Sequence, residues 1–207
     1  MTFNPKKHHR RSIRLPGYDY TQIGAYFTTI CTYKKQCWFG NVVNGKMQYN
    51  QLGVITYNFW QALPRRFSHI QLDAFVVMPN HVHGILIITD AMGAWQSQSF
   101  PSADNFSEDL PLKNNNNQKD EQFGKPIAGS IPTVIRAFKS AVTKRINLMR
   151  KTPYPPIWQR DYYESIIRQD RLDNVRQYII NNPCAWAEDE ENPDRQPHEQ
   201  LDLGLYF

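Results

Sequence analysis

Two apolar segments separated by a very short linker constrain most strongly how this 207-residue chain can fold. Residues 70–78 and 81–88 are rich in β-branched and aromatic side chains, which favour β-strands. Between them, Met78-Pro79-Asn80 has the composition of a tight turn. Two strands joined in this way lie antiparallel, so the pair predicts a largely antiparallel sheet.

Composition and periodicity predict the other elements. Residues 25–33 favour a strand, and Asn44-Gly45 is a strong signal for a hairpin turn. Apolar residues recur at helical spacing in three segments. The first helix is expected at 51–63, with Pro64 at its end, and the second begins after an N-cap at Ser130, with Pro132 in its first turn. The third is expected over about 170–182, before Pro183, and a short strand is expected at 161–167.

Strands and helices in this order predict an α+β fold, a ferredoxin-like sandwich whose mainly antiparallel sheet has its helices packed on one face. Residues 1–207 form one domain in this interpretation. Three attached segments are expected on composition alone: a basic N-terminal arm (1–15), a flexible low-complexity insertion (about 90–128) and an acidic C-terminal tail (about 187–207).

Charge and cysteine content narrow the class of protein. The net charge is +5, and five basic residues near the start indicate a phosphate-bearing partner or a solvated arm: Lys6, Lys7, Arg10, Arg11 and Arg14. No apolar run reaches the roughly 20 residues that a membrane-spanning helix needs. Three cysteines without a Cys-x-x-Cys spacing argue against both a disulfide framework and a cysteine zinc site. We expect a reducing, cytoplasmic location.

His81 and His83 are the first candidate site residues. Side chains alternate across a strand, so these two imidazoles project from one face while Val82 projects from the other. Paired imidazoles suit a divalent metal, although they are equally compatible with ordinary polar residues at the start of a strand. A metal site needs a further ligand.

Tyr178 and Asn182 lie four residues apart on the last predicted helix and therefore share one of its faces. Tyr178 falls at the edge of an apolar stripe, where its hydroxyl can reach solvent. Asn182 offers an amide oxygen, a suitable ligand for a hard cation. The alternative is structural: an aromatic residue at the edge of the core and a helix C-cap before Pro183.

These residues belong to a set of ordered motifs through which the chain resembles the HUH single-strand transposases of the IS200-like family, and most closely the REP-associated tyrosine transposases. The resemblance covers nearly the whole chain outside the insertion and the acidic tail. The motifs are Arg11-Ser12-Ile13-Arg14-Leu15-Pro16-Gly17-Tyr18-Asp19-Tyr20, Gly24-Ala25-Tyr26-Phe27-Thr28-Thr29-Ile30-Cys31-Thr32, Val77-Met78-Pro79-Asn80-His81-Val82-His83-Gly84, Trp158-Gln159-Arg160-Asp161-Tyr162-Tyr163-Glu164 and Tyr178-Ile179-Ile180-Asn181-Asn182-Pro183.

The resemblance implies a function and a role for each matching residue. His81 and His83 correspond to the metal ligands, Tyr178 to the nucleophile, and Asn182 to the polar residue that completes the metal site. The implied cofactor is Mg²⁺ or Mn²⁺, and the implied activity is cleavage and rejoining of single-stranded DNA through a 5′-phosphotyrosine intermediate. Hairpin-forming repeats are the implied substrate, and a homodimer is the implied assembly.

Three alternatives stay open at this point. Tyr162 or Tyr163 could be the nucleophile, or could stack on unpaired bases. The chain could be an HUH replication initiator or relaxase, or a non-catalytic DNA-binding regulator derived from a transposase. Arg136 and Lys139, on the polar face of a predicted helix, either keep that helix solvated or contact DNA phosphates.

Overall fold

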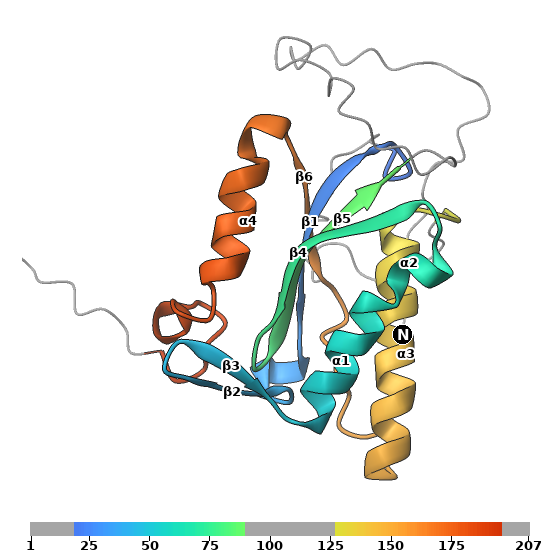
Figure 1. Ribbon diagram of the computed structural model, residues 1–207. Coiled ribbons are helices and arrows are strands. Elements are labelled where there is room, and N and C mark those ends of the chain that lie inside the picture. The colour runs from blue at the N-terminus through green and yellow to red at the C-terminus, as the bar shows by residue number, and fades with distance from the viewer. Residues whose placement is uncertain (1–18, 90–126, 196–207) are drawn as a thin grey trace, which may run out of the picture.

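Strand β5 (His81–Ile88) is buried along its whole length and lies inside the main sheet. It pairs with β4 (Ile70–Val77) on one side and with β1 (Gly24–Cys31) on the other, and both pairings are antiparallel. Strand β6 (Tyr163–Ile167) pairs antiparallel with β1, which gives the order β4-β5-β1-β6 (Figure 1). The predicted antiparallel sheet is confirmed.

The computed structural model describes residues 19–89 and 127–195. The predicted insertion lies almost wholly outside these residues, as do the basic arm and the end of the acidic tail. The remaining elements are, in chain order, the short helix η1 (Tyr33–Lys35), β2 (Gly40–Val43), β3 (Lys46–Tyr49), α1 (Gln51–Gln61), α2 (Leu63–Arg66), α3 (Ile131–Arg150), η3 (Gln169–Arg171), α4 (Leu172–Asn181) and η4 (Trp186–Glu188).

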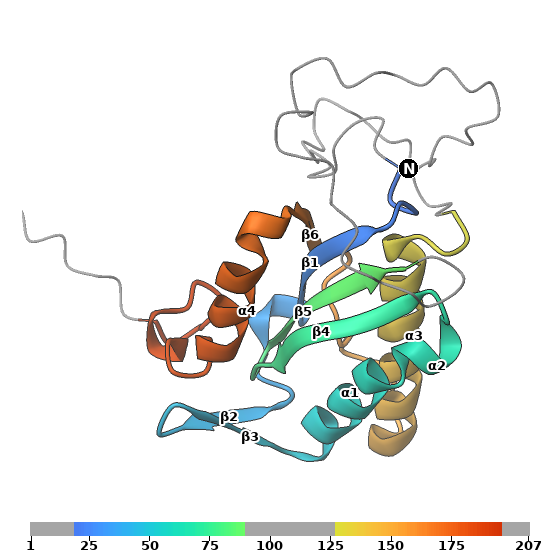
Figure 2. The same cartoon turned by 45° about the horizontal axis from the view of Figure 1, so that its top comes forward.

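The helices divide between the two faces of the sheet, whereas the sequence predicts them together on one face. Helices α1 and α3 lie on one face, and α4 covers the other (Figures 1 and 2). The alternation of β5 explains this division. Val82 and Leu86 belong to the core beneath α1 and α3, whereas Ile85 and Ile87 pack in the core beneath α4. A strand with apolar side chains on both faces needs a covering layer on each.

The small β2–β3 hairpin confirms the turn predicted at Asn44-Gly45. Both residues have positive φ angles, 51° and 69°, as a two-residue hairpin loop requires. The hairpin leads into α1, whose first turn is capped by Asn50: its side-chain oxygen accepts hydrogen bonds from the amides of Leu52 and Gly53. Helix α1 ends at Gln61, two residues before the predicted end, and Pro64 lies in the first turn of the one-turn helix α2, which begins at Leu63.

Helix α3 begins after Ser130, as predicted, but Ser130 does not cap it in the usual way. Its hydroxyl donates to the carbonyl of Ile127 and makes no bond to the amides of the first helical turn. Pro132 lies in that first turn, where a missing N–H costs little. Apolar residues at helical spacing along α3 are buried as expected, except Met149 near the end of the helix, which is exposed; the buried ones are Ile131, Val134, Ile135, Phe138, Val142 and Ile146.

Cys31, Cys37 and Cys184 are all free thiols. Among the helices within residues 19–89 and 127–195, none is long and apolar enough to cross a membrane.

Gly84 is required by close packing at the centre of the sheet, since a Cβ atom there would overlap the buried ring of Trp60. We expect Gly84→Ala to lower the free energy of unfolding by about 1–3 kcal/mol, as overpacking of a core usually does. Gly24→Ala is the matched control, because its Cβ would lie at an ordinary 3.8 Å from the Tyr26 ring. Urea denaturation measures both, and equal stability of the two variants would contradict the packing role of Gly84.

Candidate metal centre and nucleophile

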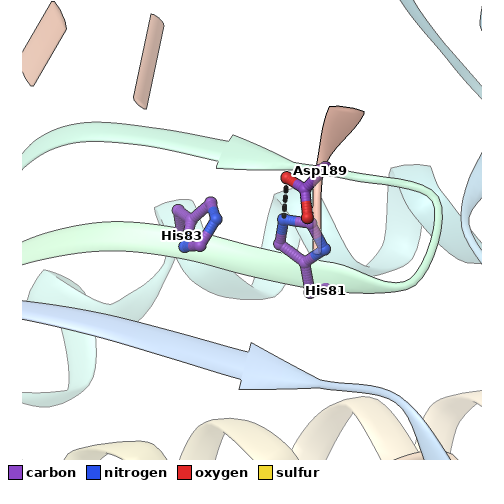
Figure 3. A group of neighbouring side chains, drawn as sticks. All are labelled: His81, His83 and Asp189. Atoms are coloured by element: carbon purple, nitrogen blue, oxygen red, sulfur yellow. Dashed lines mark ion pairs between the residues drawn. The ribbon is translucent and has the colours of Figure 1, made fainter. Parts of the chain in front are cut away.

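His81 and His83 lie side by side at the start of β5 (Figure 3). They face the α4 side of the sheet, where His83 meets the Tyr178 hydroxyl. Their ring centroids are 4.4 Å apart, and both side chains are buried. Burial lowers the pKa of each imidazole, although the nearby carboxylates of Asp189 and Glu191 partly oppose this effect at His81. Both rings are therefore held in the neutral form, which is the form that binds metals.

The neighbouring Asn80 orients the ring of His81. Its amide nitrogen donates to the backbone carbonyls of Lys35 and Glu191, so its amide oxygen faces the imidazole. That oxygen lies 2.9 Å from Nδ1 of His81 and can only accept, which places the proton on Nδ1. The lone pair is left on Nε2, and this atom is buried without a hydrogen-bond partner in the described residues. Histidines that bind metals typically donate a hydrogen bond from the other ring nitrogen in this way.

His83 is oriented by three side chains from other elements. Its Nδ1 lies 2.9 Å from the hydroxyl of Thr29 on the adjacent strand β1. The ring of Phe27, also on β1, stacks against the imidazole at 5.4 Å. On the opposite side, Nε2 of His83 lies 3.3 Å from the phenol oxygen of Tyr178 on α4. The ring is therefore fixed with one nitrogen directed to the α4 side.

Asn182 lies at the C-terminal end of α4, one turn after Tyr178, and is buried. Its amide nitrogen donates to Oδ2 of Asp189 at 3.0 Å. Its amide oxygen has no hydrogen-bond partner among residues 19–89 and 127–195. Unsatisfied buried acceptors are rare in folded proteins and call for an explanation, of which an ion is one.

Asp189 is a residue that the sequence analysis assigned to an acidic tail. After α4 the short helix η4 turns the chain back over the sheet, and the Asp189 side chain is only 7% exposed. Its Oδ2 lies 3.9 Å from Nε2 of His81 (Figure 3). The backbone amide of Glu191 donates to its other oxygen at 2.7 Å. Nothing in the sequence distinguishes this carboxylate from its acidic neighbours, because no periodic pattern continues past Pro183.

The donor atoms of His81, His83 and Asp189 all lie within 4.8 Å of one another. Two imidazole nitrogens, one carboxylate oxygen and the free amide oxygen of Asn182 form a donor set of the kind that binds divalent transition metals and Mg²⁺. The orphaned acceptors on His81 and Asn182 fit such a cation, since a cation satisfies buried lone pairs that no N–H or O–H group reaches.

Tyr178 lies at the edge of this cluster with half of its side chain exposed. Partial burial raises the pKa of its phenol, and the carboxylates of Asp189, Glu190 and Glu191 raise it further because they oppose a second negative charge. The Arg176–Asp73 ion pair, with an N–O distance of 2.6 Å, joins α4 to β4 on the same face. The position of the phenol beside His83 is thus set by helix packing.

The two rival tyrosines lie elsewhere. The Tyr162 hydroxyl donates to the buried carboxylate of Glu164 at 2.6 Å, and the ring packs against the core beneath α1 and α3. Tyr163 projects to the same side as Phe27, with ring centroids 6.2 Å apart, and is exposed. Of these three tyrosines, Tyr178 is the one whose hydroxyl contacts a histidine of the candidate metal centre.

Most of the predicted DNA contacts fall outside the described residues, namely Lys6, Lys7, Arg10, Arg11 and Arg14. Arg136 is exposed on α3. Lys139 is directed inward: its ammonium donates to the carbonyls of Gln159, Arg160 and Asp161 at 2.6, 3.1 and 3.3 Å. Burial lowers its pKa to about 8. Its three donors hold the segment before β6 against α3, which is a structural role.

In sequence, the chain is 37% identical over 190 residues to a Haemophilus influenzae protein described as an uncharacterized protein. The alignment covers 91% of this chain and 96% of that protein. The chain therefore belongs to the same family as the Haemophilus influenzae protein. No family model matches the chain.

Among solved structures, the fold is similar to that of a REP-associated tyrosine transposase bound to a REP hairpin. The TM-score is 0.51 at 15% sequence identity, over 86% of this chain and 74% of that chain. This likeness confirms the fold predicted from the sequence motifs, that of the tyrosine transposases. This likeness concerns the fold alone, and the role of each residue rests on the geometry of the site.

We expect the His81→Ala/His83→Ala double variant to lose measurable Mn²⁺ binding while it stays folded, because two of the converging donors are removed from a pocket that the surrounding sheet maintains. Isothermal calorimetry measures the affinity and circular dichroism the fold. Equal Mn²⁺ affinity in the wild type and the double variant would show that the histidines are not ligands.

Asp189→Asn tests the carboxylate that sequence analysis did not identify. The substitution keeps the shape of the side chain and removes its charge, so we expect Mn²⁺ affinity to fall by at least about tenfold. Asp194→Asn is the control, since this carboxylate is exposed on the same segment. If both variants bind Mn²⁺ like the wild type, Asp189 makes no contribution to the site.

Proposed function

We propose that this protein is a metal-dependent enzyme of the transposase type that cleaves and rejoins single-stranded DNA at hairpin or repeat sequences. The observation that carries the proposal is the position of the Tyr178 hydroxyl, 3.3 Å from His83 and beside two buried acceptors that lack partners within the described residues. A nucleophile next to a set of metal-binding donors is the arrangement that phosphoryl transfer requires.

His81, His83 and Asp189 are the residues that would hold a divalent cation, Mg²⁺ or Mn²⁺, with Asn182 as a further oxygen ligand. Such a cation, when bound, supplies positive charge that neutralises a scissile phosphate. The protein contributes the orientation: Asn80 and Thr29 fix the two imidazoles through their Nδ1 atoms. This fixed geometry avoids reorganisation during the reaction.

The reaction would proceed by in-line exchange at phosphorus. The Tyr178 oxygen bonds to phosphorus, the bond from phosphorus to the 3′ oxygen breaks, and the strand leaves with a free 3′-hydroxyl. The phenol proton passes to solvent, and the departing oxygen takes a proton from solvent. Because the 5′-phosphotyrosine conserves the phosphoester bond energy, a 3′-hydroxyl can reverse the step and join two strands.

Single-stranded DNA as the substrate is supported by the fold, which is shared with a transposase bound to a REP hairpin. One exposed tyrosine at an open site suits an accessible, unpaired phosphodiester. The homodimer expected from the resemblance stays a prediction that light scattering of the purified protein can measure.

We expect Tyr178→Phe to bind a single-stranded hairpin normally and to form no covalent adduct. The change removes one oxygen and keeps the ring that packs on Phe27 at 6.0 Å. Wild-type protein should form the adduct only with divalent metal present, through the 5′-phosphate of the cut strand. A gel shift that resists denaturation detects the adduct, and mass spectrometry identifies the attached residue.

Tyr163→Phe is the matched control, since Tyr163 is also exposed and its ring also lies against Phe27, with centroids 6.2 Å apart. It should retain adduct formation at the wild-type rate. Trapping of DNA on Tyr162 or Tyr163, or full activity in Tyr178→Phe, would overturn the assignment of the nucleophile.

A further inference from the structure

A groove of about 550 Å³ lies between strand β6 and helix α4, and Tyr178 forms part of its wall. The wall formed by η3 and α4 presents Arg171, Asn174 and Tyr178, which recur at helical spacing and so face the same way. On the sheet side, Phe27 and the backbone of β6 line the groove. Its volume is in the range of pockets that hold small ligands. The four donor residues of the candidate metal centre do not line this space.

The groove carries positive charge at one end and aromatic rings at the other. Two guanidinium groups, from Arg168 and Arg171, lie in the β6–α4 connection at one end. The aromatic rings of Phe27 and Tyr178 lie at the other end, next to His83. Cations at one end and aromatic rings at the other match the phosphate and the base of a nucleotide. An apolar or acidic ligand would leave one of these two ends without a partner.

The two arginines can exchange their present partner for a new anion. In the described structure both guanidinium groups contact the carboxylate of Asp170, at 3.6 and 3.7 Å. All three side chains are largely exposed, and ion pairs of this kind contribute little to stability. A phosphate oxyanion can therefore replace or share this contact at small cost, and an arginine can bind it through two N–H groups.

The position of β6 adds a polar edge to the groove. Among the described strands, β6 is the last in the sheet and is paired with β1 alone. Ser165 and Ile167 alternate with Ile166 along this edge, and all three line the groove. A strand edge of this kind presents N–H and C=O groups toward whatever lies beside it. Asn174, across the groove on α4, is exposed and adds an amide. The backbone groups of β6 and the amide of Asn174 can each hydrogen-bond the edge of an unpaired base.

We propose that the groove between β6 and α4 binds the unpaired nucleotides joined to the scissile phosphate, with Arg168 and Arg171 on their phosphates and the aromatic end against a base. This inference deepens the proposed function and rests on it, since it places the substrate strand along the wall that carries Tyr178. The groove then determines which unpaired segment reaches the nucleophile, so it selects single strands over duplex.

Fluorescence anisotropy without metal, in EDTA, tests the groove apart from catalysis. The probe is a fluorescein-labelled single strand of about 12 nucleotides, within the site sizes of single-strand binding proteins. The Arg168→Gln/Arg171→Gln variant should bind it about tenfold more weakly. The slope of log K against log salt should fall by about 1.4, at about 0.7 for each phosphate that the variant no longer neutralises.

The matched control is Lys144→Gln/Arg145→Gln, which removes the same charge from two exposed residues of α3 on the other face of the sheet. It should keep the wild-type affinity and salt slope. Hydrogen exchange should show protection of β6 and of the first turn of α4 when the strand binds. A fully paired duplex should bind equally to the wild type and the Arg168→Gln/Arg171→Gln variant.

Several outcomes would overturn the groove assignment. The first is that Arg168→Gln/Arg171→Gln binds the single strand with wild-type affinity and salt dependence. The second is that the control variant loses as much affinity, and the third is that hydrogen-exchange protection is confined to elements other than β6 and α4. Failure of the proposed function is a separate result: no covalent adduct on Tyr178 with metal present, while metal-free binding still depends on the two arginines. If the adduct forms and neither binding nor cleavage depends on Arg168 and Arg171, the proposed function holds but the groove is not the binding site of the strand.

Discussion

Strand β5 is buried on both faces, and most of the architecture depends on covering it. One face carries Val82 and Leu86 and is closed by α1 and α3, with the Trp60 ring directly over Gly84. The other face carries Ile85 and Ile87 and is closed by α4. Because α4 packs on the apolar end of that face, its next turn lies over the polar end, where His83 meets Tyr178. The same packing that buries the core thus assembles the candidate site.

Burying imidazoles and amides inside a sheet face is costly unless each polar atom is paired. Most of them are: Asn80 pairs with His81, Thr29 with His83, and Asp189 with Asn182. The two acceptors that stay unpaired within the described residues, on His81 and Asn182, lie in the same cluster. The other buried side-chain atoms without a partner in the described residues are donors, on Trp38, Trp60 and Arg150. The two unpaired acceptors belong to residues that both lie against Oδ2 of Asp189, and lone pairs gathered beside a carboxylate are suited to a cation.

Alternation and helical spacing account for how far the sequence could predict this site. His81 and His83 share a face because strand side chains alternate, and Tyr178 and Asn182 share one because a helical turn separates them. Neither rule says that α4 lies on the face opposite α1 and α3, since that depends on which surfaces of β5 remain uncovered. Asp189 could not be predicted at all. It follows an irregular turn, and its segment is held by Lys35 and Asn80, more than a hundred residues away along the chain, which donate to the next two backbone carbonyls, those of Glu190 and Glu191.

The acidic segment has a further electrostatic consequence. Lys35 and Asn80 hold it against the start of β5, where Glu191 pairs with the Lys35 ammonium at 3.4 Å. Its carboxylates raise the pKa of Tyr178, and for the same reason they repel an approaching phosphodiester. A cation among these carboxylates reverses both effects, since it favours the phenolate and attracts the phosphate. On the proposed function, metal and DNA therefore bind with positive coupling at Tyr178. The arginines at the far end of the groove lie apart from this charge, which allows a strand to be held there before the phosphate meets the nucleophile.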